Sequence, residues 1–171
     1  VYLDTIISPS YTSAIAQSIQ IPGIAGMENN MVIFEFDKDK PGNLEHIVEN
    51  FALVNAGNFD VLILASSERK VNFKNGIHIW ISSSDSSNAN LMILLGFIIS
   101  GHPDWKKTDI RIFNVCPPEL EAESLIKMKE LIRSGRLPIT SNNIEIIPQD
   151  HDLSAKKLVN EKSGDAGLVI L

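Results

Sequence analysis

Residues 77–113 decide the fold of this chain, and they read IHIWISSSDSSNANLMILLGFIISGHPDWKKTDIRIF. The stretch begins with IHIWI and ends with IRIF, two short runs of β-branched and aromatic residues that are typical of strands. Between them, residues 91–100 form an apolar run that predicts a buried helix. Polar residues before this run offer several helix caps, and a Gly-His-Pro sequence ends it. A strand, a helix and a second strand in this order indicate a parallel crossover unit.

The same alternation continues on both sides of this stretch. The predicted strands are residues 2–6, 31–36, 61–65, 77–81, 110–115, 144–147 and 168–171. The predicted helices are residues 11–20 with Ser10 as the N-cap, residues 44–51 and onward to Gly57, residues 91–100, a helix from about residue 117 to residue 133, and residues 153–162. This order predicts an α/β fold with an open, mostly parallel twisted sheet and helices on both faces. The near-continuous apolar run at residues 61–65, VLILA, is expected to be buried on both sides.

The composition is that of a globular domain with a net acidic charge. Of 171 residues, 44% are hydrophobic and 21% are charged, which is ordinary for a folded chain. Lys and Arg number 15 against 21 Asp and Glu, a formal net charge of −6, so the basic surface that a nucleic-acid partner requires is missing. The apolar run at residues 91–99 is shorter than the ~20 residues that a membrane span needs. Both ends, VYLDTI and AGLVIL, are strand-like, and we expect the chain to be a piece of a longer polypeptide.

Glycine-rich and serine-rich loops are the places to look for a phosphate site. The chain has no GxxxxGK[ST] sequence. Gly23 and Gly26 lie between a helix and the following strand, whereas a dinucleotide-binding loop lies between a strand and the following helix, so we interpret them as helix-stop and turn residues. The serines after residue 81, with Asp85 and the N-terminus of the next helix, could hold an anion. The preferred interpretation of this loop is a capping and turn segment.

The sequence offers no spacing typical of a metal or catalytic site. Asp37 and Asp39 share a turn that could bind a cation, but two carboxylates in a solvated turn usually bind nothing. Cys116, the single cysteine, is expected to be a small strand-end residue rather than a nucleophile. Because no pair of histidines has metal-ligand spacing, all four are expected to be surface or packing residues: His46, His78, His102 and His151. No GxSxG sequence is present, so we assign no catalytic residue, no cofactor and no metal site.

The two tryptophans have different expected roles. Trp80 lies in a predicted strand and is expected in the core. Trp105 lies just before the predicted strand at residues 110–115, where it either closes the end of a helix as a lid or anchors an interface.

The order of features in residues 77–113 resembles that of a known family. A strand ending in Trp is followed by a short Asp-containing turn, an apolar helix and the pattern W-K-x-x-x-I-R-[IV]-F. This order is similar to the C-terminal cytosolic domain of the cation-chloride cotransporters, the sodium–potassium–chloride and potassium–chloride symporters. The W-K…I-R-I-F segment is its most specific part.

Two further segments, collinear with the first, extend this resemblance over nearly the whole chain. The loop GIAGMENN at residues 23–30, followed by MVIFEF, is similar to the family's loop G-L-G-R-M-K-P-N and its strand TLVLGF. Three of its residues match, and four depart from the family pattern, which puts the function of that loop in doubt. The matches are Gly23, Met27 and Asn30, and the departures are Ala25, Gly26, Glu28 and Asn29. The end, SAKKLVNEKSGDAGLVIL at residues 154–171, is similar to the family's late helix and strand.

The resemblance implies an architecture, a location and partners. It implies an α/β fold related to universal stress proteins and built of two similar lobes, with residues 1–26 as the tail of a truncated first lobe and residues 27–171 as the second. The domain would follow a membrane part that carries sodium, potassium and chloride, on the cytoplasmic side of the cell membrane. Its implied partners are a second copy of itself and its own transmembrane transport domain. The short connection at residues 66–76 is similar to that of a prokaryotic member.

Two other functions remain open at this level. One is a free-standing nucleotide-binding protein of the universal stress type, against which the missing phosphate motif counts. The other is a small enzyme on an open α/β sheet, for which no acid–base pair or nucleophile emerges. The non-catalytic regulatory and dimerisation domain is the preferred hypothesis.

Overall fold

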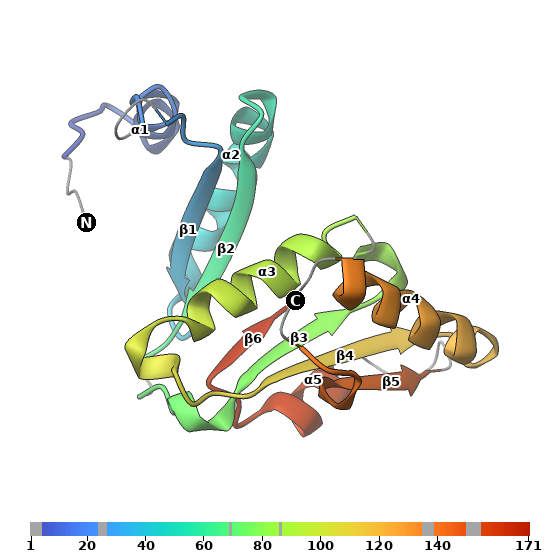
Figure 1. The fold of residues 1–171 in the computed structure, drawn as a ribbon. Helices are drawn as coiled ribbons and strands as arrows, with labels where there is room; N and C mark the ends of the chain where they lie inside the picture. Colours follow the sequence, from blue (N-terminus) through green and yellow to red (C-terminus); the bar gives the residue numbers. More distant parts are fainter. Residues whose placement is uncertain (1–4, 24–26, 69, 86, 135–138, 150–154) are drawn as a thin grey trace. The chain divides into compact units, whose positions relative to one another are not determined.

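A computed structural model describes residues 5–23, 27–68, 70–85, 87–134, 139–149 and 155–171 of the chain (Figure 1). Its contacts divide the chain into two units, residues 1–69 and residues 70–171. Both are α/β structures built on parallel strands, as the alternating sequence predicts. The predicted strands are thus divided between two sheets, one in each unit. The expected division after residue 26 concerns two lobes of a longer protein and stays a prediction.

The first unit is a β-α-β crossover preceded by a helix. Its elements are α1 (Tyr11–Ser18), β1 (Met31–Asp37), α2 (Leu44–Ala56) and β2 (Asp60–Ser66). Ser10 caps α1 as predicted, because its Oγ accepts the backbone N–H of Ser13 at 3.1 Å. The two strands pair in parallel register from Met31 opposite Asp60 to Asp37 opposite Ser66. The small core on the helix side of the strands consists of Ile15, Phe34, Ile47 and Val54.

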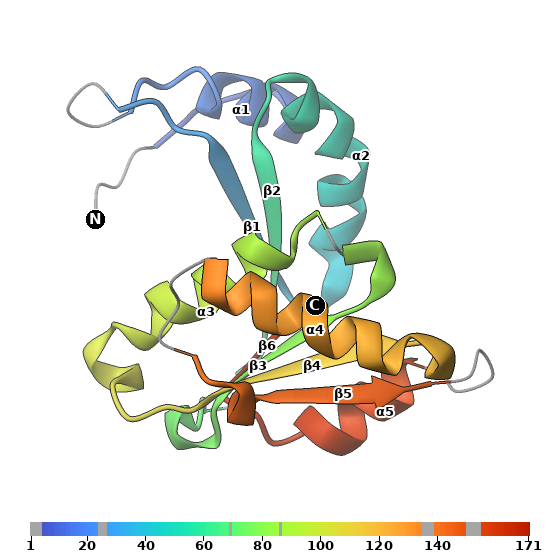
Figure 2. The same cartoon turned by 45° about the vertical axis from the view of Figure 1, so that its right-hand side comes forward.

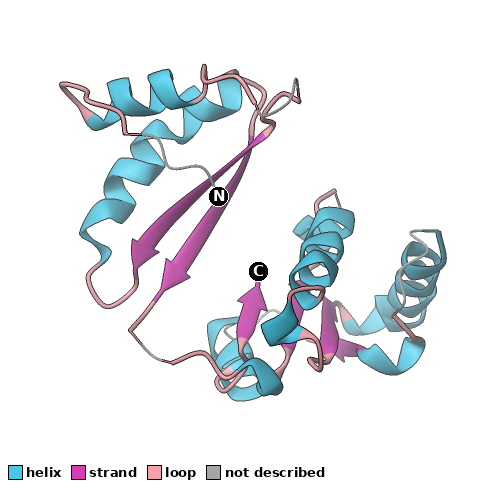
Figure 3. Ribbon diagram, turned by 60° about the vertical axis from the view of Figure 1, so that its left-hand side comes forward, coloured by secondary structure: helices cyan, strands magenta, loops and turns pink. Residues whose placement is uncertain are grey.

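The apolar run at residues 61–65 is not buried on both sides, so that prediction is wrong. Ile63 and Leu64 of β2 are exposed, and so is Ile33 of the paired strand. In Figure 3, α2 lies against one side of this strand pair. A two-stranded sheet with helices on one side has only one covered face, which the sequence of a single strand does not reveal.

The second unit is a four-stranded parallel sheet. Its strands are β3 (Ile77–Ile81), β4 (Ile110–Cys116), β5 (Ile144–Pro148) and β6 (Leu168–Ile170), in the order β5-β4-β3-β6. Its helices are α3 (Ala89–Ser100), α4 (Glu121–Ser134) and α5 (Ala155–Ser163). Figure 2 shows α3 and α4 on one face of the sheet and α5 on the other. The predicted arrangement of helices on both faces is therefore confirmed in this unit.

All five residues of β3 are buried, which makes this the strand that is covered on both sides. Alternation along the strand directs Ile77, Ile79 and Ile81 to the face of α3 and α4, and the two residues between them to the face of α5. The larger core, under α3 and α4, consists of Ile77, Ile79, Ile81, Ala89, Met92, Ile93, Ile110, Ile112, Met128, Ile132 and Ile139. The smaller core, under α5, consists of Trp80, Phe113 and Ile147. Full burial of each such side chain stabilises the fold by about 1.5–3 kcal/mol.

Helix α3 is only half buried, although the sequence predicts a buried helix. Met92 and Ile93 face the sheet, whereas Leu94, Phe97 and Ile98 are exposed. Part of this apolar run is therefore exposed, which its composition alone does not indicate. Among the described residues, no helix is long and apolar enough to cross a membrane.

The remaining boundaries agree with the predicted segments to within a few residues. Two predicted segments fall partly outside the described residues: residues 2–4 of the first predicted strand, and residues 153–154 of the last predicted helix. Thr5 and Ile6 are not in a strand, so that prediction is wrong where it can be checked. Short 3-10 turns lie between the main elements, at Pro41–Asn43, Phe73–Asn75, Ser83–Asp85, Pro103–Trp105, Pro118–Leu120 and Ser141–Asn143.

Candidate functional site

The serine-rich loop after β3 folds as a capped turn. The carboxylate of Asp85 accepts the backbone N–H of Ser82 at 2.8 Å and the Ser82 hydroxyl at 2.5 Å. In return, the backbone N–H of Asp85 donates to the Ser82 carbonyl at 3.1 Å. The Asp85 carboxylate thus occupies two donors of the loop, so the turn interpretation is confirmed for its described part, whereas no side chain caps α3 at Asn88.

The Asp37 loop, also considered as a ligand site, is a turn. The Asp37 carboxylate accepts the backbone N–H of Asp39 at 2.9 Å, which is a local turn hydrogen bond. A Cβ atom at Gly23 would overlap the Met27 carbonyl, so the backbone passes too close for a side chain there, while Gly26 lies outside the described residues. Within the described ranges, no group of three or more His, Cys, Asp or Glu side chains could hold a metal ion.

The histidines differ in their surroundings. His46 is exposed on α2, with Nδ1 3.6 Å from the Glu49 carboxylate. His102 is exposed, and its Nδ1 accepts the backbone N–H of Asp104 at 3.3 Å, which caps a 3-10 turn. His151 lies outside the described residues. His78, in β3, is only 4% exposed and is the packing residue that the sequence analysis expected.

His78 belongs to a buried polar network that local sequence patterns could not reveal. Its Nδ1 lies 2.7 Å from the Ser163 hydroxyl, and the indole Nε1–H of Trp80 donates to the same hydroxyl at 2.9 Å. Ser163 is the last residue of α5 and is also 4% exposed. One serine therefore ties the end of α5 to two side chains of the central strand, across a sequence separation of more than 80 residues.

The hydrogen bonds fix the role of Ser163 toward Trp80 but not toward His78. An indole N–H can only donate, so the Ser163 oxygen accepts from Trp80. A hydroxyl oxygen has a second lone pair, so His78 Nδ1 either accepts the serine proton or donates its own, according to the tautomer of the ring. Burial lowers the pKa of His78 below its ordinary value of 6.5; the Arg111 guanidinium lowers this pKa further, and Asp165 raises it. His78 is therefore neutral at pH 7.

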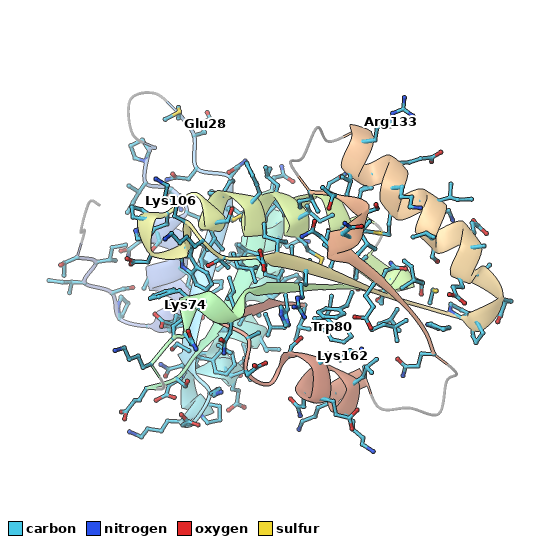
Figure 4. All side chains as sticks on the ribbon, turned by 60° about the horizontal axis from the view of Figure 1, so that its bottom comes forward. Glu28, Lys74, Trp80, Lys106, Arg133 and Lys162 are labelled. Carbon is cyan, nitrogen blue, oxygen red and sulfur yellow. The ribbon has the colours of Figure 1, made fainter. Side chains whose placement is uncertain are left out.

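Aromatic rings surround the network. The Phe113 ring stacks on Trp80, with 4.5 Å between ring centroids, and meets the His78 ring edge-on at 5.2 Å. Lys162 lies over the Phe113 ring, 6.0 Å from its centroid, and its Nζ is 2.6 Å from the Glu145 carboxylate. Figure 4 labels Trp80 and Lys162 on the α5 side of the sheet. Trp80 is a core residue, as predicted.

Trp105 and Cys116 both pack against neighbouring residues of the fold. The Trp105 ring meets the Phe73 ring edge-on at 4.9 Å and packs against the larger core, as the lid interpretation predicts. Cys116 is buried at the end of β4, and no described residue forms a hydrogen bond with its sulfur. The expectation of a small strand-end residue is confirmed.

A shallow hollow lies at the amino ends of β4 and β5. Asp109, Arg111 and Glu145 line it, so both signs of charge are present. Asn143, also in its wall, already uses its amide to donate to the Ile110 carbonyl at 2.9 Å. The open shape and mixed charge of this hollow define no ligand class.

The outer face of α3 is an exposed apolar surface on a helix without charges. The helix has no charged residue, and Leu94, Phe97 and Ile98 are 44%, 38% and 61% exposed. We call these three residues the α3 outer face. Asp85 precedes this helix, and Asp104, Lys106 and Lys107 follow it, so charges lie only beyond its two ends. An exposed apolar patch of this kind marks an interaction site more often than a reaction site.

Comparison with known proteins identifies no relative of this chain. No protein-family model matches the chain, and a search of curated proteins gives no match.

Proposed function

We propose that the chain is a non-catalytic cytosolic regulatory and dimerisation domain of a cation-chloride cotransporter. The α3 outer face carries this proposal, because it is an apolar surface without catalytic groups around it. The resemblance of residues 77–113 and 154–171 to that family supports the choice of transporter. The transported ions would bind in the membrane part and not to these residues.

The occupant of the α3 outer face is a second copy of the chain. A chain with a formal charge of −6 repels its own copy, so a self-association surface must be locally neutral or have opposite charges facing each other. The α3 helix is neutral over all 12 of its residues. When two copies pair about a two-fold axis with their α3 helices antiparallel, Asp85 of each copy faces the opposite helix end of the other. That end carries Asp104, Lys106 and Lys107, which together have a net positive charge. Two apolar faces are then covered, and the charges beyond the facing helix ends are opposite in net sign.

Regulation would act through these dimer contacts. A contact between copies can bias the transport domain only if its free energy differs between the conformations of that domain. The proposed role of this chain is to supply that difference in contact energy, without a chemical step.

The alternative is a nucleotide-binding protein of the universal stress type. Such a protein needs donors for phosphate at the carboxyl ends of its strands. After β3, the Asp85 carboxylate accepts the Ser82 N–H and the Ser82 hydroxyl, and its negative charge opposes a phosphate. This charge counts against the nucleotide-binding alternative.

The test is the solution mass of the chain, measured by light scattering with and without excess ATP. We expect a dimer whose mass ATP does not change. Ile98→Glu should weaken the dimer at least a hundredfold in Kd, because the two-fold axis places a charge in the apolar contact twice. Ile126→Glu is the matched control, since Ile126 is equally exposed on α4 but lies outside the α3 outer face.

Three results would contradict the proposal in different ways. A monomer that binds ATP with measurable heat favours the nucleotide-binding alternative. A monomer without ATP binding refutes dimerisation. A dimer that Ile126→Glu disrupts and Ile98→Glu does not moves the interface away from α3.

A further inference from the structure

A buried polar contact joins the end of α5 to the sheet, in addition to apolar packing and the Lys162–Glu145 ion pair. Helix α5 has only nine residues, and two of them, Leu158 and Val159, pack on the aromatic core. At its C-terminal end, Ser163 holds both His78 and Trp80 through one hydroxyl. Such a short helix adds little stability of its own, so its tertiary contacts hold it in place.

We propose that α5 is a pH-sensitive latch, which opens from the sheet when the His78 ring takes up a proton. In this proposal the neutral ring carries its proton on Nε2 and accepts the Ser163 hydroxyl proton at Nδ1, which is one of the two roles that the 2.7 Å distance allows. A protonated ring carries N–H groups on both nitrogens, so Nδ1 can no longer accept. The Ser163 proton then has no acceptor within the network, and a positive charge is buried among the rings of Phe113 and Trp80.

The charged groups around His78 oppose a positive charge on its ring more than they favour one, so proton uptake favours the open state of α5. Arg111, its register partner on β4, opposes a second positive charge, whereas Asp165, which follows α5, favours it. Lys162 of α5 stands over Phe113 and pairs with Glu145 of β5, so this carboxylate is already neutralised. Ordinary Asp and Glu side chains titrate near pH 4, so histidines are the side chains that titrate in the pH range just below 6.5.

The sign of the pH effect follows from the direction of the shift. Burial lowers the pKa of His78 when α5 is closed, and opening returns it toward the ordinary 6.5. The open state therefore binds more protons between these two pKa values. The opening constant should rise as pH falls below 6.5, by up to about tenfold per pH unit, and should be constant above pH 7.5.

Amide hydrogen exchange of the full chain measures this opening directly. Protection factors are compared at pH 7.5, 6.5 and 5.5 after correction for the intrinsic exchange rate at each pH. We expect the amides of α5 (Ala155–Ser163) to be less protected than those of α3 (Ala89–Ser100) at every pH. Their protection should fall by up to about tenfold per pH unit below 6.5. The Cys116 thiol, on the opposite side of β4 from Phe113, should stay unreactive on the time scale of α5 opening.

Two variants assign the effect to His78. In His78→Asn, a neutral amide oxygen takes the place of Nδ1 as acceptor, and the pH dependence of α5 protection should disappear. In the triple variant His46→Gln, His102→Gln, His151→Gln, His78 is the only remaining histidine, and the pH dependence should remain unchanged.

Any of three results would overturn the latch. The first is α5 protection equal to α3 protection at every pH, because α5 would then open only with the whole unit. The second is pH-independent α5 protection in the wild type. The third is loss of the pH dependence in the triple variant, in which His78 is still present. This last measurement tests the latch even if His78→Asn does not fold. None of these results depends on whether the chain forms a dimer.

Discussion

Ser163 shows how much one small residue can organise in this fold. Its hydroxyl oxygen accepts the Trp80 indole N–H at 2.9 Å and forms a second hydrogen bond with His78 Nδ1 at 2.7 Å. It is the last residue of a lysine-rich helix, and nothing local marks it as buried. The partners lie 85 and 83 residues away, so only the packing of α5 on β3 brings the three side chains together.

Replacing Ser163 with alanine should lower the free energy of unfolding by about 1–3 kcal/mol. The change leaves the buried Trp80 N–H and the His78 Nδ1 without their partner, and the cost is that of desolvating unpaired polar groups. Chemical denaturation monitored by tryptophan fluorescence measures it. Ser18→Ala is the control, because the Ser18 hydroxyl bonds only the Ala14 carbonyl at an exposed site and should change stability by less than about 0.5 kcal/mol. Equal effects for the two serines would contradict the network.

At the scale of elements, the sequence predicts which segments are strands and helices better than which faces are covered. The IHIWI and IRIF runs become β3 and β4 within one residue of the predicted bounds, because β-branched residues bounded by turn residues leave little alternative. The VLILA run is equally apolar, yet Ile63 and Leu64 of β2 are exposed. Coverage depends on how many strands and helices pack around a segment, and that information lies in other parts of the chain.

The candidate sites follow the same rule. The Asp85 turn could be predicted because its hydrogen bonds join residues three positions apart. The α3 outer face could not, because a helix of apolar residues all round has no polar side to mark its exposed face. The His78 network could not be predicted because its hydrogen bonds are long-range.

Helix α3 approaches the sheet so closely that Gly96 has no room for a side chain. A Cβ atom there would lie 2.8 Å from Cδ1 of Ile79, which is fully buried and cannot easily move. Gly96→Val should therefore lower the free energy of unfolding by about 1–3 kcal/mol through overpacking, even though valine is a better helix former than glycine.

Thermal or denaturant unfolding measures the Gly96→Val effect. Gly42→Ala is the control, because a Cβ at Gly42 meets no atom within 4 Å, and we expect little change. An unchanged or raised stability for Gly96→Val would mean that α3 can move away from β3 at no cost.

For the whole molecule, the two units differ in how much structure each has to support it. In the described part of residues 70–171, four strands have helices on both faces and two apolar cores. The described part of residues 1–69 contains two strands and one small core, and sheets of two strands are marginally stable on their own. The stability of the second unit is therefore expected to be intrinsic to its own residues.

Expressed alone, residues 70–171 should unfold in a single cooperative transition, whereas residues 1–69 alone should show none. Circular dichroism during urea denaturation distinguishes the two outcomes.

Because α3 lies wholly within residues 70–171, this fragment should also have the mass of a dimer in light scattering, and Ile98→Glu should reduce it to a monomer. A folded but monomeric fragment would place the contact between copies in residues 1–69, and the exposed Ile33 and Leu64, on the face of the strands opposite Phe34, would then replace the α3 outer face as the surface to mutate.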